Sequence, residues 1–224
     1  MRLKVIITGA TGMVGEGVLL ECLQNENVNE VLIVNRKPYD LEHPKLKQLL
    51  VPDFSKLQDR KAELEGFDTC FFCAGVSSVG MNEEKYTQIT YDMTLSFAKT
   101  LVRINPNMVF TYVSGSHTDS TENGRVMWAR VKGKTENDLM RLGFKAVYNF
   151  RPGVMYPTQS QKNWKTLYKW IAKSIRLVAP KSVLNISEVG KAMINAVVLG
   201  HTKHVLEISD IRYLASGYSH QQPS

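Results

Sequence analysis

The sequence predicts an α/β protein, in which helices cover both faces of a doubly wound parallel sheet of about seven strands. Apolar runs alternate with helical patterns along the chain, and a glycine-rich turn joins the first strand to the first helix. The chain has 224 residues, which is long enough for one well-buried domain and too short for two ordinary ones. We therefore expect a single domain over residues 1–224.

The expected strands are short, mainly apolar runs, and residues 3–8 form a continuous one, as is typical of a central parallel strand that is buried on both faces. In chain order they cover residues 3–8, 30–35, 47–51, 68–74, 108–114, 145–150 and 204–209. The first of them, LKVIIT, reads as a central strand because it holds four apolar residues and no turn residue.

The expected helices lie between these strands, where apolar residues recur at helical spacing. In chain order they cover residues 13–23, 55–65, 84–103, 125–142, 163–175 and 188–199. Gly143 is the expected C-cap of the helix over 125–142, and Ser187 is the expected N-cap of the last one. The polar tail 217–224 is expected to fray.

Composition and charge exclude several classes of function. Hydrophobic residues make up 43% of the chain and charged residues 22%, as in ordinary globular proteins. The net charge is +7, but the lysines and arginines are scattered, so we expect a phosphate-bearing small ligand and no nucleic acid. The chain has no apolar stretch of membrane-spanning length, and its N-terminus lacks a signal-peptide pattern, so we expect no membrane association and a cytoplasmic location.

Two of the three cysteines, Cys70 and Cys73, have a C-x-x-C spacing that can indicate redox or metal chemistry. They lie inside a buried strand, where residues three apart point to opposite faces of the sheet. We therefore interpret them as small buried hydrophobes and expect no metal site.

The turn after the first strand carries the spacing G-x-x-G-x-x-G, formed by Gly9, Gly12 and Gly15. Gly9 allows the chain to turn off the strand, Gly12 leaves space for a pyrophosphate, and Gly15 allows the helix to approach the sheet closely. The free N–H groups and the dipole of the following helix favour an anion, so we expect phosphates here, with Thr11 and Met13 also in contact.

The segment TGATGxxG resembles the corresponding loop of the extended and atypical short-chain dehydrogenase/reductases, whose Rossmann fold binds a nicotinamide dinucleotide. In its size, the chain resembles the small members of this family, the Tat-interacting oxidoreductase-like proteins. These are similar to sugar-nucleotide epimerases, but their C-terminal substrate lid is reduced. The resemblance implies cofactor contacts for further segments, namely Asp53, Cys73-Ala74-Gly75, Ser114, Lys132 and Arg151-Pro152-Gly153.

The end of the second strand favours NADP(H) over NAD. An NAD site usually holds a carboxylate there for the ribose 2′-hydroxyl, whereas this chain has Asn35-Arg36-Lys37. Arg36 and Lys37 offer two cations to a 2′-phosphate, and the arginine can bind it with a planar fork.

The resemblance fails at Trp128, which stands where the family has its catalytic tyrosine. That phenol exchanges a proton with the substrate, and the lysine four residues later, here Lys132, supplies the positive charge that it needs. An indole only donates and does not titrate in a useful range. The cofactor half of the motif is therefore present and the proton-transfer half is absent.

Two interpretations stay open. In the first, the protein is an oxidoreductase or epimerase-like enzyme acting on an unknown small substrate, with His117 or Tyr156 replacing the tyrosine and Ser116 binding a substrate carbonyl. In the second, the protein binds NADP(H) without turnover and acts as a regulatory or interaction protein, as the NmrA-like relatives of this fold do.

Overall fold

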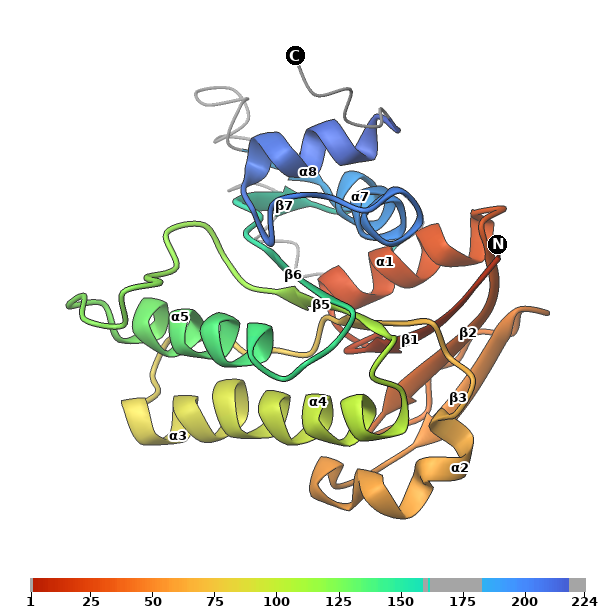
Figure 1. Ribbon diagram of the computed structural model, residues 1–224, viewed down its shortest axis with the longest axis horizontal. Helices are drawn as coiled ribbons and strands as arrows, with labels where there is room; N and C mark the ends of the chain where they lie inside the picture. Colours follow the sequence, from red (N-terminus) through yellow and green to blue (C-terminus); the bar gives the residue numbers. More distant parts are fainter. Residues whose placement is uncertain (1, 159–160, 162–182, 218–224) are drawn as a thin grey trace.

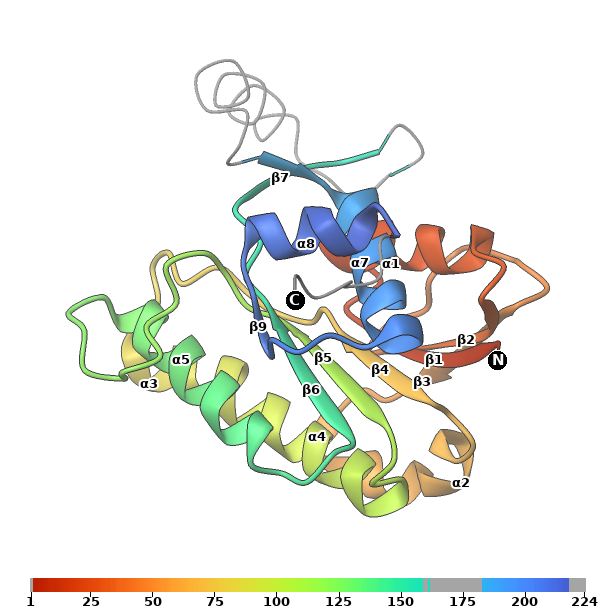
Figure 2. The same cartoon turned by 45° about the horizontal axis from the view of Figure 1, so that its top comes forward.

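The computed structural model describes residues 2–158, 161 and 183–217. One seven-stranded sheet has the order β3-β2-β1-β4-β5-β6-β9 (Figures 1 and 2, with all seven strands labelled in Figure 2), and every neighbouring pair is parallel. Its strands are β1 (Leu3–Thr8), β2 (Val28–Asn35), β3 (Leu46–Leu50), β4 (Thr69–Phe72), β5 (Val109–Val113), β6 (Ala146–Phe150) and β9 (Val205–Leu206). The predicted doubly wound sheet is therefore confirmed.

Helices form a layer on each face of the sheet, as Figures 1 and 2 show. One layer holds α1 (Met13–Gln24), α7 (Ile186–Leu199) and α8 (Ile208–Ala215), and the other holds the 3-10 helix η1 (Phe54–Arg60), α2 (Lys61–Leu64), α4 (Met93–Ile104) and α5 (Met127–Met140). Strand residues alternate between the two cores: Val5 and Ile7 face α1, and Ile6 faces the opposite layer.

The strand order places a switch point between β1 and β4. The chain moves outward from β1 through β2 to β3 and then returns to place β4 on the other side of β1. In open α/β sheets, ligands bind in the crevice at the carboxyl ends of the strands at such a point. The loops after β1 and β4 are therefore where a ligand site is expected.

The C-terminal part differs from the sequence prediction. The strand expected over 204–209 is wrong beyond Leu206, because α8 begins at Ile208. A capping box starts this helix: the N–H of Glu207 donates to Asp210 Oδ2 at 3.1 Å, and the Glu207 side chain accepts from the backbone N–H of Asp210. A small parallel sheet of β7 (Val154–Tyr156) and β8 (Val183–Asn185) was not predicted.

Three predicted helices also differ in detail. The helix over 84–103 is three segments, α3 (Glu83–Thr87), the π-helical turn η2 (Gln88–Asp92) and α4, and the helix over 55–65 begins as η1. Asn185, not Ser187, is the N-cap of α7: its Oδ1 accepts from Ser187 N at 2.8 Å. The expected helix 163–175 and the tail beyond Gly217 lie outside the described residues. In the described part of the chain, no helix has the length and apolarity to span a membrane.

Candidate functional site

The glycine turn fixes the end of β1 against the end of β4. Gly9 has a φ of 72°, and a Cβ there would lie 2.7 Å from the backbone nitrogen of Ala74, so this position requires glycine for both conformation and space. Thr8 Oγ1 accepts hydrogen bonds from the N–H groups of Cys73 and Ala74, each at 3.2 Å. The two loops at the switch point therefore form one rigid unit.

Gly12 and Gly15 have different tasks. A Cβ on Gly15 would lie 2.1 Å from the carbonyl oxygen of Gly9, so α1 packs directly on the turn at this point. A Cβ on Gly12 would meet only that same oxygen, at 3.3 Å. The fold therefore needs glycine at position 15, whereas at position 12 it leaves the N-terminal end of α1 open to a ligand.

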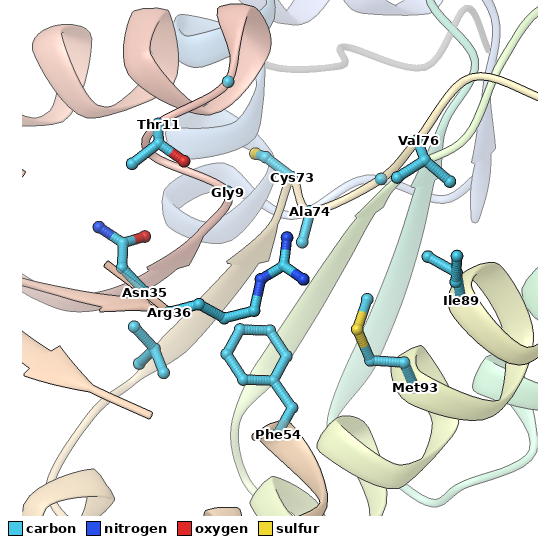
Figure 3. Close-up of a pocket in the computed structure, with 13 residues that line it drawn as sticks. Gly9, Thr11, Asn35, Arg36, Phe54, Cys73, Ala74, Val76, Ile89 and Met93 are labelled. Atoms are coloured by element: carbon cyan, nitrogen blue, oxygen red, sulfur yellow. The ribbon is translucent and has the colours of Figure 1, made fainter. Parts of the chain in front are cut away.

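A cavity of about 270 Å³ lies at these loops (Figure 3). It brings together seven of the predicted cofactor residues: Gly9, Thr11, Gly12, Arg36, Cys73, Ala74 and Gly75. It is also lined by six residues that were not predicted to contact a cofactor: Val34, Asn35, Phe54, Val76, Ile89 and Met93. Ile89 and Met93 could have been found from their spacing of four on a helix, which places both on one face.

The second-strand end contributes donors to this cavity. Arg36 is exposed and extends into the cavity toward Ala74 in Figure 3. Asn35 is 4% exposed, and its Nδ2 has no hydrogen-bond partner in the described structure. The described residues that line the cavity include no carboxylate. An anion with several oxygens fits this set, because a buried N–H donor without a partner is costly.

A second hollow of about 370 Å³ adjoins the cavity and shares Arg36, Phe54 and Met93 with it. Its other residues are Pro52, Asp53, Gln88, Asp92 and Ser96, so the predicted Asp53 lies here and not in the main cavity. The π-helical turn η2 lies against both hollows, with Ile89 on the first and Gln88 and Asp92 on the second. Such turns are frequent at functional sites.

The cysteines lie on opposite faces, as predicted. Cys70 is buried in the core beside α4, and Cys73 packs against the core beside α1. Burial raises the pKa of the Cys73 thiol to about 12, so the thiol stays protonated at neutral pH. It serves the cavity wall as a small apolar side chain.

The serine segment follows β5. Ser114 is 7% exposed, and its Oγ lies 3.0 Å from Thr118 Oγ1, so this hydroxyl binds within the loop. Ser116 is half-buried, and its N–H donates to the carbonyl of Pro152 at 3.1 Å, which holds the two loops together. His117 is exposed and has a φ of 67°, a conformation that few residues other than glycine adopt.

Trp128 and Lys132 lie on α5 beside this segment. An added Cβ on Gly115 would lie 3.8 Å from Trp128 Cζ3, so the indole lies close to the serine loop at Gly115. Lys132 Nζ donates to the carbonyl of Val113 at 3.3 Å and lies 5.1 Å from the ring centre of Tyr112. Burial lowers the pKa of Lys132 to about 8, although the nearby Glu136 carboxylate opposes the shift.

Arg151 is engaged by protein partners. Its Nε donates to Oε1 of the fully buried Glu136 at 3.0 Å, and its Nη1 lies 3.3 Å from Glu207 Oε1. A further bond to Ser120 ties in the loop before α5. This guanidinium therefore joins β6, α5 and the start of α8, and the cofactor contact expected of Arg151-Pro152-Gly153 stays a prediction.

Met13, Gly15 and Lys37, also predicted to contact the cofactor, line neither hollow. The Met13 carbonyl accepts from Gln161 Nε2 at 2.6 Å, and Lys37 is exposed. Tyr156 lies in β7, opposite Asn185 in the register of the small sheet. None of the described acidic, histidine and cysteine side chains form a group of three or more that could hold a metal ion.

One family model and several known proteins match this chain. Residues 5–124 match the model of the NAD dependent epimerase/dehydratase family. Protein HTATIP2 of Rattus norvegicus is 26% identical over 154 residues, covering 68% of this chain and 62% of the rat protein. Protein FMP52-2, mitochondrial, of Scheffersomyces stipitis is 28% identical over 158 residues, covering 69% of this chain and 67% of the yeast protein.

Among solved structures, the Bordetella bronchiseptica enzyme WbmF in complex with NAD+ matches with a TM-score of 0.69 and 15% identity, covering 96% of this chain and 77% of WbmF. This likeness shows the fold. The chain spans 52% of the leucinostatins biosynthesis cluster protein T of Purpureocillium lilacinum and 62% of the rat protein, so it covers less than two thirds of these two relatives. The family model covers more than half of the chain, and the chain therefore belongs to the NAD-dependent epimerase/dehydratase family of short-chain dehydrogenase/reductase-like proteins.

Proposed function

We propose that the protein binds NADP(H) in the cavity at the switch point and acts as an oxidoreductase or epimerase-like enzyme on a small carbonyl or hydroxyl substrate. The observation that carries the proposal is the end of β2, where Asn35 and Arg36 line a cavity whose described lining residues include no carboxylate. The solved relatives WbmF and MoeE5 are complexes with NAD, so the preference for a 2′-phosphate rests on these two residues of this chain.

Each part of the site has a task in this proposal. The N–H groups at the start of α1 bind the pyrophosphate, and Gly12 leaves the necessary space. Arg36 binds the 2′-phosphate, Phe54 and Met93 provide apolar walls, and Lys132 binds the nicotinamide ribose. The cofactor supplies or accepts the hydride. Ser116 binds the substrate oxygen.

The cofactor preference is testable by calorimetry with NADPH and NADH. We expect the wild-type protein to bind NADPH more tightly, and Arg36→Ala to narrow the difference by about 1.5–3 kcal/mol, the value of a charge-assisted hydrogen bond. Arg103→Ala is the control, because it removes the same charge from an exposed position at the end of α4. Equal affinities in the wild-type protein, or a preference for NADH, would refute the proposed preference.

A second candidate function, an NADP(H)-responsive regulatory or interaction protein, is favoured by Trp128. Its indole lies beside Gly115 of the serine loop, stands where the resemblance implies the catalytic tyrosine, and cannot exchange a proton there. The exposed His117, in the serine loop, is the alternative acid that the sequence offers. If His117 carries the proton, the wild-type protein turns over a substrate with a histidine-like pH profile, and His117→Ala removes that activity.

Trp128→Tyr distinguishes the candidates. We expect this variant to reduce reactive aldehydes and dicarbonyls with NADPH, at a rate up to about 10²–10⁴ times that of the wild-type protein, the value of a placed proton donor. Trp128→Phe is the matched control, because it opens the same space without a hydroxyl. Equal rates for the two variants would show that the missing phenol is not what limits turnover.

The cytoplasmic location expected from the sequence stays a prediction, because the FMP52 relatives are named as mitochondrial proteins. Cell fractionation with a tagged copy of the full chain decides between the two compartments.

A further inference from the structure

Tyr39, in the loop between β2 and β3, is held by three hydrogen bonds to residues outside the loop. Its N–H donates to Gln48 Oε1 at 3.0 Å, and its carbonyl accepts from Gln48 Nε2 at 2.7 Å. Its hydroxyl donates to Glu16 Oε1 at 2.8 Å. The side-chain amide of one strand residue thus brackets the Tyr39 backbone, while the phenol reaches a different element.

The residue before this loop is equally fixed. Asn35 is the last residue of β2, and its carbonyl accepts a hydrogen bond from Val51 N at 2.9 Å. Only Arg36, Lys37 and Pro38 lie between these two anchors, and all three are exposed. Proline further restricts the backbone of this short span. The backbone position of Arg36 is therefore set by the anchors at the two ends of this span, because Arg36 itself is exposed.

Glu16 connects this span to the phosphate end of the site. It lies in the first turn of α1 and is 1% exposed, and its N–H donates to the carbonyl of Gly12 at 2.9 Å. The Tyr39 hydroxyl therefore ties the loop that carries Arg36 to the helix whose N-terminus borders the cavity. Burial and the Glu16 carboxylate raise the pKa of Tyr39, which keeps the phenol a donor.

We propose that the Tyr39–Glu16 hydrogen bond is a latch that positions Arg36 for the 2′-phosphate, so that Tyr39 is a positioning residue for cofactor selectivity although it lines neither hollow. This inference rests on the proposed NADP(H) function. Its physical basis is preorganisation: a cation held in place loses less freedom when it binds than one on a loose loop.

The test is the ratio of NADPH to NADH affinity, measured by calorimetry on the full chain. Tyr39→Phe keeps the ring and removes only the hydroxyl. We expect it to lower the ratio by about three- to tenfold, the effect of one lost hydrogen bond, and to leave NADH affinity nearly unchanged. Glu16→Gln keeps an oxygen acceptor for the phenol, so it is expected to retain the wild-type ratio. Glu16→Ala is expected to lower the ratio as Tyr39→Phe does.

Tyr91→Phe is the matched control, because Tyr91 donates the same kind of bond, to Asp138 Oδ2 at 2.7 Å, and itself lines neither hollow although it lies in η2. We expect it to leave the ratio unchanged. An unchanged ratio in Tyr39→Phe, or an equal loss of NADPH and NADH affinity, would overturn the latch while leaving the proposed function intact. A wild-type protein without a preference for NADPH would instead refute the proposed function, and the latch with it.

Discussion

Gly12→Val is expected to abolish NADPH binding while the protein stays folded, and Gly15→Val is expected to prevent normal folding. A side chain at position 12 projects toward the space proposed for the pyrophosphate and meets only one protein atom, at 3.3 Å. At position 15 the added Cβ lies 2.1 Å from the backbone of Gly9, which cannot move without displacing the turn. The two variants should therefore lose different properties: Gly12→Val loses cofactor binding, and Gly15→Val loses stability.

Thermal unfolding and calorimetry on both variants check this pair. For Gly12→Val we expect an unfolding midpoint within a few degrees of the wild-type value and no measurable affinity for NADPH. For Gly15→Val we expect the free energy of unfolding to fall by more than about 4 kcal/mol. This loss lowers the midpoint of thermal unfolding by roughly 10 °C or leaves the protein insoluble. Normal NADPH binding by Gly12→Val would show that the phosphates lie elsewhere.

Arg151→Leu is expected to destabilise the protein by about 3–5 kcal/mol, because it leaves the carboxylate of Glu136 buried without its partner. Glu136 is fully buried, and the side chain of Arg151 is only 10% exposed. Urea unfolding of the apoprotein measures the loss. Because the effect comes from the unpaired charge, the double variant Arg151→Leu with Glu136→Leu should recover a large part of it.

An exposed ion pair is the control for this experiment. Arg141 lies 2.8 Å from Asp138 at the end of α5, with 72% of its side chain exposed. Arg141→Leu should cost less than about 1 kcal/mol, as exposed pairs usually do. If Arg151→Leu costs no more than Arg141→Leu, the three elements are not held together by this guanidinium.

The sheet and the cofactor loops could be predicted because their signals are local. A parallel strand that is buried on both faces appears as a mainly apolar run, and β1, β2, β4, β5 and β6 each contain one, although polar residues such as Lys4, Thr111 and Asn149 interrupt some of them. The phosphate-binding turn could be predicted because Gly9, Gly12 and Gly15 all lie in one short segment. The structure adds that Gly15 packs on the turn itself, which the spacing alone does not reveal.

The remaining features depend on contacts between distant segments. The sequence shows the arginine of Arg151-Pro152-Gly153 but not Glu136, its partner from another element, so its role was assigned from resemblance. Asp53 was likewise assigned from resemblance, whereas Phe54 lines the cavity through the position of η1 and carries no local sequence signal for that role. The strand expected over 204–209 fails because the pattern of alternating apolar residues in VLEIS fits a strand, whereas the cap formed by Glu207 and Asp210 starts a helix after only two paired residues.

A crystal structure of the protein with NADP+ tests the proposed cofactor site. We expect the pyrophosphate at the N-terminus of α1 beside Gly12 and the 2′-phosphate within hydrogen-bonding distance of the Arg36 guanidinium. A cofactor with its pyrophosphate away from Gly12, or with a 2′-phosphate that Arg36 does not contact, would contradict it.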